Sequence, residues 1–372
     1  MMGKRRGRIS RDASSPASTQ VHDDRGSRPT WMFAWGDISG IGGTEARMIE
    51  AIPLLKERGI EVVSVARSSR EDSAFVRRLR GAGAEVQILR SWLEYARALR
   101  AFRGSAVWAF GLKQSLVARG VRIGAPWRLV MARNGADYGW RPWMHFADRV
   151  SQRLVDIYLT NSASVGGLLV SRGIAPSKVA TVTGGLPDRW FEPAQGAKPS
   201  EVVFVMVGNR RPEKNQLLGV KAFLAAGIPA TLRVYTDDGD EVRDCLRALP
   251  DADAAKVQLI EGVRTDPTIY DQCAVLFHPS LSESLPLAVL EAMARGCFVV
   301  GAAVGDIPEV LAGGGGLVVD PTSVRDMEKA LQRAFDHVND AGYTRSPSPV
   351  KSARQYVTEV AGVVRSGRGP GS

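Results

Sequence analysis

Two glutamates in the C-terminal half of the chain are the residues whose type and spacing most directly suggest chemistry. Glu283 follows a short polar segment, 278–280, and Glu291 lies in an apolar stretch that ends at Gly296. At about 1.5 Å of helix per residue, their backbones would lie about 12 Å apart. The paired carboxylates of glycosidases lie roughly 5–9.5 Å apart. We therefore expect the two carboxylates to hold opposite ends of one elongated ligand, such as a nucleotide sugar, and not to act on a single bond.

A polar segment that contains a glycine joins a predicted buried strand, 202–207, to a predicted helix, 216–226. The residues of this segment that could contact a phosphate are Gly208, Asn209, Arg210, Arg211 and Lys214. Free N–H groups at a helix N-terminus and the helix dipole favour an anion, and nearby cations add to that field. Arginine makes bidentate contacts with phosphate oxygens, and lysine supplies a compact charge. The segment therefore predicts a diphosphate site.

The sequence around the two glutamates resembles the Glu-x7-Glu motif of the family 4 retaining glycosyltransferases, which have the GT-B fold. The flanking segments 279–280, 290–296 and 298–300 also match that pattern. The resemblance covers roughly residues 31–335. It implies an α/β protein with two Rossmann-like doubly wound domains that face a central cleft. It also implies transfer of a hexose-type sugar from a nucleotide-diphosphate sugar to an acceptor hydroxyl or amine, with retention at the anomeric carbon.

The resemblance implies a role for each of the residues named so far. Lys214, with Arg210 or Arg211, would neutralise the charge that grows on the diphosphate leaving group. Glu283 would orient the hydroxyls of the donor sugar, and Glu291 would bind the ribose. The other residues implied to bind the donor are Gly43, Gly208, Asn209, Gly262, Val263, Arg264, Ser284, Leu285, Pro286 and Leu287.

Three positions depart from the usual pattern of that family. Asn209 stands where the family usually has an arginine, so Arg210 or Arg211 would have to contact the phosphate. Asn134 stands where the family often has a histidine. An asparagine can form hydrogen bonds but cannot titrate, so we expect no histidine-assisted proton transfer at this position. Gly184 stands where the family usually has an asparagine.

On the N-terminal side of the expected cleft, Gly42 and Gly43 belong to a glycine-rich turn before a helix predicted over 44–58. Glycines let the backbone approach a phosphate or a sugar, and the following helix adds its dipole. The turn resembles the glycine loop in the N-terminal domain of the family. That resemblance implies that Gly43 contacts the donor, and that Gly42 and Asn134 lie on the acceptor or sugar side.

Strands alternate with helices along two stretches of the chain, which predicts two domains with parallel sheets. Ligands of such sheets bind at the carboxyl ends of the strands, where the residues above lie. The predicted strands are 31–35, 60–65, 86–89, 106–109, 127–131 and 157–160, then 202–207, 231–235, 257–260, 275–277 and 298–300. The expected segments are a disordered basic arm (1–29), an acceptor-binding domain (30–189), a linker (190–200), a nucleotide-sugar-binding domain (201–345), a helix that could cross back to the first domain (346–364) and a flexible tail (365–372).

Composition excludes several classes of protein. The chain has 372 residues, 44% hydrophobic and 24% charged, which is typical of a globular protein with two domains. Cys245, Cys273 and Cys297 have no paired spacing, which argues against a disulfide framework or a zinc site and favours a reducing, cytoplasmic environment. No run of about 18 apolar residues predicts a membrane span, and we expect no secretory signal. We expect no required cofactor, only a nucleotide-diphosphate sugar as co-substrate, with a UDP-sugar favoured over a GDP-sugar.

Positive charge is concentrated in the N-terminal half of the chain, whose formal net charge at pH 7 is +10. Residues 31–190 contain 23 Lys and Arg against 13 Asp and Glu, whereas residues 191–372 contain 19 against 23. A basic surface attracts an anion, here a phosphorylated acceptor or the anionic surface of a membrane. No nucleic-acid-binding motif is recognisable, which argues against nucleic acid. The amphipathic stretch 91–103 could lie on a membrane, although we favour packing against the sheet.

The acceptor stays open between a natural-product scaffold, a sugar or sugar phosphate, and a lipid-linked glycan. Two other functions also remain open. A nucleotide-sugar epimerase or hydrolase would need acid–base groups in the cleft, and the chain has only 4 histidines. A non-catalytic nucleotide-sugar-binding subunit would account for Asn209 and Asn134, and it predicts binding without turnover.

Overall fold

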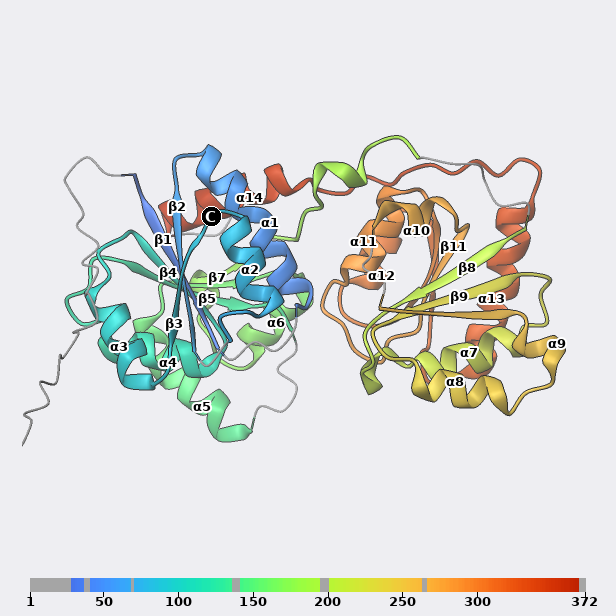
Figure 1. The fold of residues 1–372 in the computed structure, drawn as a ribbon, viewed down its shortest axis with the longest axis horizontal. Coiled ribbons are helices and arrows are strands. Elements are labelled where there is room, and N and C mark those ends of the chain that lie inside the picture. Colours follow the sequence, from blue (N-terminus) through green and yellow to red (C-terminus); the bar gives the residue numbers. More distant parts are fainter. Residues whose placement is uncertain are drawn as a thin grey trace, which may run out of the picture.

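The computed structural model describes residues 28–36, 41–67, 70–135, 141–194, 201–262 and 266–367. They form two α/β domains that lie side by side (Figure 1). One chain segment leads from the first domain to the second, and another returns from the second domain to the first near the end of the chain. The two domains with parallel sheets confirm the fold class predicted from the sequence.

The N-terminal domain contains a parallel sheet of seven strands in the order β3-β2-β1-β4-β5-β6-β7. The strands are β1 (Thr30–Trp35), β2 (Glu61–Arg67), β3 (Glu85–Leu89), β4 (Ala106–Phe110), β5 (Arg128–Arg133), β6 (Ile157–Thr160) and β7 (Val179–Thr181). The helices are α1 (Gly43–Glu57), α2 (Ala74–Gly81), α3 (Trp92–Ala101), α4 (Leu112–Val121), α5 (Pro142–Ser151) and α6 (Ala163–Ser171). The strand order reverses between β1 and β4, which is where open parallel sheets bind ligands.

The first strand illustrates why this sheet is covered on both faces. Trp31, Phe33 and Trp35 pack in a cluster that contains the buried side chains of α1 and α2. Met32 and Ala34, which alternate with them, pack in a second cluster with the side chains of α3 and α4. Successive side chains of a strand point to opposite faces, so a strand without polar alternation needs helices on both sides.

The C-terminal domain contains a parallel sheet of six strands in the order β10-β9-β8-β11-β12-β13. The strands are β8 (Val203–Val207), β9 (Thr231–Thr236), β10 (Val257–Glu261), β11 (Val275–His278), β12 (Phe298–Ala302) and β13 (Gly316–Val319). The helices are α7 (Gln216–Ala225), α8 (Asp240–Arg247), α9 (Asp251–Ala254), α10 (Pro267–Asp271), α11 (Leu287–Ala294), α12 (Ile307–Leu311) and α13 (Val324–Asn339). Two hydrophobic clusters cover the two faces of this sheet.

The last helix, α14 (Ala353–Ser366), packs on the N-terminal domain. Its residues Tyr356, Val357 and Val360 are buried in the same cluster as α1. The two segments that connect the domains also pair with each other, because Ala353 donates a backbone hydrogen bond of 2.7 Å to the carbonyl of Leu186. The N-terminal domain is therefore completed by the end of the chain (Figure 1).

The predicted strands omitted the two short edge strands β7 and β13. β13 begins in a run of four glycines, residues 313–316, which by itself predicts a turn. Pairing with β12 holds this segment extended.

Cys273 and Cys297, whose spacing in the sequence did not suggest a contact, lie together in the C-terminal core. They are free thiols, and their sulfur atoms lie 3.5 Å apart. This contact and the strand β13 both depend on partners that are distant in the sequence.

Candidate functional site

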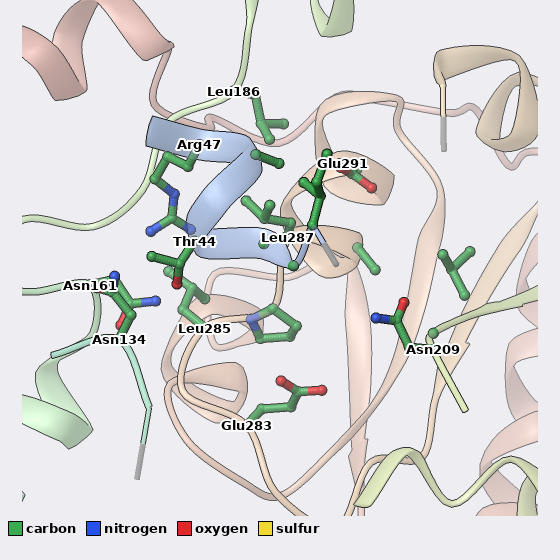
Figure 2. A pocket seen from close by; sticks show the side chains of 18 of the residues that line it. Thr44, Arg47, Asn134, Asn161, Leu186, Asn209, Glu283, Leu285, Leu287 and Glu291 are labelled. Atoms are coloured by element: carbon green, nitrogen blue, oxygen red, sulfur yellow. The ribbon is translucent and has the colours of Figure 1, made fainter. Parts of the chain in front are cut away.

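A pocket of about 750 Å³ lies between the two domains, at the carboxyl ends of strands from both sheets (Figure 2). Asn134 and Asn161, which follow β5 and β6, line it from the N-terminal domain. Gly208 and Glu283, which follow β8 and β11, line it from the C-terminal domain. The pocket thus lies where the topology of both sheets predicts a ligand.

Most of the candidate residues from the sequence line this one pocket. They are Gly42, Gly43, Asn134, Gly208, Asn209, Arg211, Lys214, Gly262, Glu283, Ser284, Leu285, Pro286, Leu287 and Glu291. Arg210 does not line the pocket, and Val263 and Arg264 lie outside the described residues.

The expectation that Arg210 could reach the ligand needs correction. Its Nη1 atom lies 2.5 Å from Oδ2 of Asp238, and its side chain is 46% exposed. This ion pair holds the guanidinium against the loop after β9. Arg211, the next residue, lines the pocket. Of the two arginines that the sequence left open, Arg211 is the one placed to meet an anionic ligand.

Lys214, Glu283 and His278 form a compact hydrogen-bonded group in the pocket. Nζ of Lys214 lies 2.6 Å from Oε1 of Glu283, and Nε2 of His278 lies 3.0 Å from the same oxygen. Ser280 Oγ lies 3.1 Å from Nε2 of His278. The lysine and the glutamate were recognisable from the sequence, whereas the histidine was only part of the polar segment 278–280. The signal available for His278 was its place at the carboxyl end of a buried strand.

Asn215, whose backbone has the left-handed α conformation, positions Lys214. Asn215 has φ = 56°, a conformation that asparagine tolerates better than most residues. Its side-chain amide donates hydrogen bonds to the carbonyls of Pro279 (3.1 Å) and Pro321 (2.8 Å). The N–H of Leu281 also donates to the carbonyl of Glu213 at 2.7 Å. These bonds hold the lysine turn and the glutamate loop against each other.

The surroundings of the two glutamates shift their pKa values in opposite directions. Burial alone raises the pKa of Glu283, but His278 and Lys214 outweigh it and lower the pKa to about 2. Burial raises the pKa of Glu291 to about 7, and the hydrogen bond from Tyr270 offsets only part of that rise. Glu283 is therefore a carboxylate throughout the physiological range, whereas Glu291 changes its charge near neutral pH.

Glu291 is a buried residue of α11, with a side chain that lines the pocket. The hydroxyl of Tyr270 donates a hydrogen bond of 2.9 Å to its Oε2 atom. α11 begins only at Leu287, so Glu283 precedes the helix, and helical rise describes only part of the path between the two glutamates. Tyr270 has no local sequence signal, because it is separated from Glu291 by 21 positions.

The start of α11 faces the same pocket. Its N-cap is Pro286, which provides no side-chain acceptor. The first N–H groups of a helix need a partner from outside the helix, and they favour an anion. Pro286, Leu287 and Ala288 all line the pocket. An anion here would meet Lys214 and the start of α11 together.

Ser284 connects the two domains across the pocket. Its hydroxyl donates a hydrogen bond of 3.0 Å to the backbone carbonyl of Asn134 and accepts one of 3.3 Å from Nδ2 of Asn161. Asn134, which the sequence placed on the acceptor side, thus contributes its backbone to the domain contact. Its side chain also lies at the pocket (Figure 2).

Asp306, which precedes α12 in the C-terminal domain, caps a helix of the other domain. Its two carboxylate oxygens accept hydrogen bonds from the N–H groups of Ala163 (2.6 Å) and Ser164 (2.8 Å) at the start of α6. A carboxylate at a helix N-terminus satisfies free donors and interacts favourably with the helix dipole. This cap fixes the relative position of the domains at one edge of the pocket.

No group of three or more metal-binding side chains was found among the described residues. The site therefore consists of cations, carboxylates and free backbone donors arranged around a cleft between two sheets. Such a site can bind a doubly charged phosphate group and, beside it, several hydroxyl groups.

Comparisons with known proteins agree with this geometry. Residues 188–341 match the model of the family described as glycosyl transferases group 1. The chain is 25% identical over 224 residues to the MMP alpha-(1->4)-mannosyltransferase of Mycolicibacterium hassiacum, a match that covers 56% of this chain and 51% of that protein. It is 32% identical over 139 residues to the UDP-Gal:alpha-D-GlcNAc-diphosphoundecaprenol alpha-1,3-galactosyltransferase of Escherichia coli, covering 33% of this chain and 36% of that protein. The chain thus spans about half or less of the length of these relatives.

The solved structure of HepE from Anabaena, in complex with UDP and glucose, has the same fold. Its TM-score against this chain is 0.75, at 15% sequence identity, over 91% of this chain and 100% of that one. This likeness extends across both domains, whereas the family match is confined to the C-terminal domain and its approaches. The chain has the GT-B fold.

Proposed function

Because residues 188–341 match the model of the glycosyl transferases group 1 family and the chain has the GT-B fold, we propose that this protein is a retaining glycosyltransferase. It moves a hexose from a nucleotide-diphosphate sugar to an acceptor hydroxyl or amine. The observation that carries the proposal is the meeting of Lys214, Glu283 and Glu291 in one pocket between the domains. These groups match three parts of a nucleotide sugar, which are its diphosphate, its sugar and its ribose.

The donor lies along the C-terminal domain. Its diphosphate contacts Lys214, Arg211 and the free N–H groups at the start of α11, which together neutralise the phosphate charge. Its ribose hydroxyls donate hydrogen bonds to Glu291. Its sugar hydroxyls donate to Glu283, which remains an acceptor because its pKa is lowered to about 2.

Stabilisation of the leaving group drives the reaction. The bond between the anomeric carbon and the diphosphate oxygen breaks as the acceptor oxygen or nitrogen bonds to the same carbon. The acceptor proton passes to the departing diphosphate oxygen. Lys214 and the helix N-terminus oppose the negative charge that grows on this oxygen, so they act most strongly at the transition state.

The names of similar proteins favour a UDP-sugar and a glycan acceptor. The E. coli relative is named for UDP-Gal and a diphosphoundecaprenol acceptor, and the Anabaena structure contains UDP. The acceptor enters from the N-terminal domain, where Gly42 and Asn134 line the pocket. A small-molecule glycan and a lipid-linked glycan both suit this side of the cleft.

Calorimetry with UDP, GDP, ADP and dTDP, without added metal, tests the donor site. We expect one nucleotide to bind tightly and its affinity to fall at least about tenfold in Glu291→Ala, because charged hydrogen bonds contribute about 1.5–3 kcal/mol.

Transfer from the matching nucleotide sugar to a panel of acceptors then tests the reaction. The anomeric proton coupling of the product tests whether the configuration at the anomeric carbon is retained. No binding of any nucleotide would contradict the proposal. A new sugar isomer without acceptor would favour an epimerase instead, and binding without turnover a non-catalytic subunit.

A surface on the N-terminal domain supports peripheral contact with an anionic membrane. For the stretch 91–103 the sequence favoured packing against the sheet over a membrane face, and α3 does bury Tyr95 and Leu99 against the sheet. Four of the exposed apolar side chains follow α5 and the turn after it at helical spacing. They are Trp143, Phe146, Val150 and Leu154.

Charge favours an anionic lipid surface as the partner of this α5 stripe. Arg141, Arg149 and Arg153 are exposed on the same segment as the four apolar side chains. Amphipathic helices with this composition lie in the membrane interface, where the apolar residues enter and the cations meet lipid phosphates. None of the described helices is long and apolar enough to span a membrane. We propose that α5 brings the cleft to a membrane that carries the acceptor.

A further inference from the structure

Arg47, on the first turns of α1, is a buried cation without a hydrogen-bond or ion-pair partner among the described residues. Its side chain is only 7% exposed, and it lines the pocket from the N-terminal domain. Its Nε atom is fully buried and has no hydrogen-bond partner. The Tyr356 ring, whose centroid lies 5.9 Å from the guanidinium carbon, provides a cation–π contact only. A buried cation that lacks a carboxylate partner normally costs several kcal/mol, so it requires an explanation.

The two nearest acidic side chains of α1 do not neutralise Arg47. Glu50 forms an ion pair of 2.7 Å with Arg189. Glu45 turns back to accept a hydrogen bond of 3.0 Å from the N–H of Gly42. Burial accordingly lowers the pKa of Arg47, since no carboxylate of the described residues compensates the lost hydration. The positive charge of Arg47 is therefore available to pair with an anionic group that enters the pocket.

The chain makes room for this guanidinium at Gly184. A Cβ atom at position 184 would lie 2.4 Å from the guanidinium carbon of Arg47, so a larger residue there would displace this side chain from its observed place. This glycine is one of the three departures from the glycosyltransferase pattern. Glycine at position 184 thus leaves the space that the guanidinium of Arg47 occupies beside the pocket.

A second polar group on the same side also lacks a partner. Oδ1 of Asn161 is buried and makes no hydrogen bond, although its Nδ2 atom donates to Ser284. Figure 2 shows Arg47, Thr44, Asn134 and Asn161 together on one side of the pocket, away from Glu283 and Asn209. The start of α1 also lines the pocket, nearer to Leu287, and its N-cap Gly42 offers no side-chain acceptor to its first N–H groups. Arg47 is thus a donor at the pocket that an anion could pair with, and Oδ1 of Asn161 is an acceptor that lines the same pocket.

We propose that Arg47 binds an oxyanion of the acceptor substrate, while Oδ1 of Asn161 accepts a hydrogen bond from one of its hydroxyls. The acceptor is therefore a polyhydroxylated anion, such as a sugar phosphate or a sugar acid, free or attached to a lipid. This inference rests on the proposed glycosyltransferase function, and it makes the acceptor, not the donor, the source of the anion. The donor diphosphate has its own cations in Lys214 and Arg211.

Calorimetry with inorganic phosphate tests the site in the full chain, with the tightest-binding nucleotide present at saturation to fill the donor site. We expect phosphate to bind, and Arg47→Met to weaken it at least about tenfold, in the range of one charged hydrogen-bonded contact. Nucleotide affinity should change less than about twofold, a difference of about 0.4 kcal/mol. Arg58→Met, an exposed arginine at the end of the same helix, is the matched control and should change neither affinity.

Thermal unfolding separates a binding role from a structural one. If Arg47 is kept for a ligand, Arg47→Met should unfold at the same or a higher temperature than the wild type without phosphate, because it removes a buried unpaired charge. Phosphate should raise the unfolding temperature of the wild type but not that of the variant. A lower unfolding temperature in Arg47→Met together with unchanged phosphate affinity would overturn the proposal.

Two further outcomes separate this inference from the proposed function. A loss of nucleotide affinity in Arg47→Met as large as in Lys214→Met would assign the arginine to the donor diphosphate and overturn the acceptor site. If no nucleotide binds the wild type, the glycosyltransferase proposal fails. Phosphate titrated alone, with Arg47→Met and Arg58→Met compared, would then still decide whether Arg47 binds an oxyanion.

Discussion

Nζ of Lys214 lies 2.6 Å from Oε1 of Glu283, so the cation proposed for the diphosphate and the carboxylate proposed for the sugar form one ion pair. The two residues are 69 positions apart, and the loop after β11 and the turn before α7 bring them together. The pair fixes the lysine where the leaving group would be. It also keeps the carboxylate ionised for the sugar hydroxyls.

Removing this lysine should slow the chemical step more than it weakens binding. We expect Lys214→Met to lower kcat roughly 10²–10³-fold, the usual effect of losing one group that stabilises transition-state charge. Arg210→Gln is the matched control, because its guanidinium pairs with Asp238 outside the pocket. It should keep kcat within about twofold, or about 0.4 kcal/mol. Equal losses in both variants would contradict the assignment, and steady-state kinetics with the matching nucleotide sugar would show it.

The raised pKa of Glu291 predicts a pH-dependent stability. A carboxyl group whose pKa rises from its ordinary value to about 7 on folding stabilises the protein while it is protonated. Its contribution is complete below about pH 4.5 and is lost as the pH rises through 7. Relative to wild type, Glu291→Gln should therefore become more stable by about 2–4 kcal/mol between pH 5 and pH 8, as measured by urea unfolding.

The same titration should appear in nucleotide binding. Ribose hydroxyls donate more strongly to a carboxylate than to a neutral carboxyl group. Affinity for a nucleoside, which lacks the titrating phosphates, should rise between pH 6 and pH 8 in the wild type and stay constant in Glu291→Gln. A parallel rise in both proteins would show that another group titrates.

Asp306 is expected to hold the two domains together at the edge of the pocket. Its carboxylate accepts two backbone hydrogen bonds at the start of α6, and the loss of such a cap costs about 0.5–2 kcal/mol. In Asp306→Ala, amide hydrogen exchange should accelerate at Ala163 and Ser164. Asp320→Ala is the control, since Asp320 accepts from the N–H of Thr322 within one domain. Faster exchange in the control, or none in Asp306→Ala, would contradict the link.

Asp148 is expected to be essential for the stability of the N-terminal domain. Its buried carboxylate pairs with Arg119 (2.6 Å) and Arg133 (2.8 Å), and the hydroxyl of Tyr158 donates to it at 2.8 Å. Asp148→Asn would leave buried arginine charge uncompensated and should cost about 3–5 kcal/mol in urea unfolding. Asp244→Asn, in an exposed pair with Arg247, should cost no more than about 1 kcal/mol.

The α5 stripe should mediate vesicle binding. We expect the wild type to float with vesicles of equal parts phosphatidylcholine and phosphatidylglycerol, less so as salt rises, and not with phosphatidylcholine alone. Replacing Trp143 and Phe146 by Ala should reduce flotation strongly. Leu93→Ser, an exposed position on α3, should leave it unchanged and thereby separates α5 from the stretch 91–103. Unaltered flotation of the α5 double variant would exclude this surface.

Much of the fold could be predicted because its signals are local. The alternation of buried strands with helices over 31–160 and 202–300 reproduces the observed order of elements except at the edges. Strands such as β1 and β8 are continuous apolar runs, which only a sheet covered on both faces can bury. The edge strand β13 has no such run, and its extended form depends on hydrogen bonds from β12.

The sequence by itself determined which residue types are available for the chemistry, because turns and helix starts are encoded by neighbouring residues. The segments around Gly208 to Lys214 and around Glu283 to Glu291 could therefore be recognised without coordinates. Only the tertiary structure decided how these groups are paired. It turned Arg210 towards Asp238, placed His278 on Glu283, and left Arg47 without a counter-ion among the residues that the structure describes. Charge pairing depends on distances across the fold, and local sequence spacing does not contain those distances.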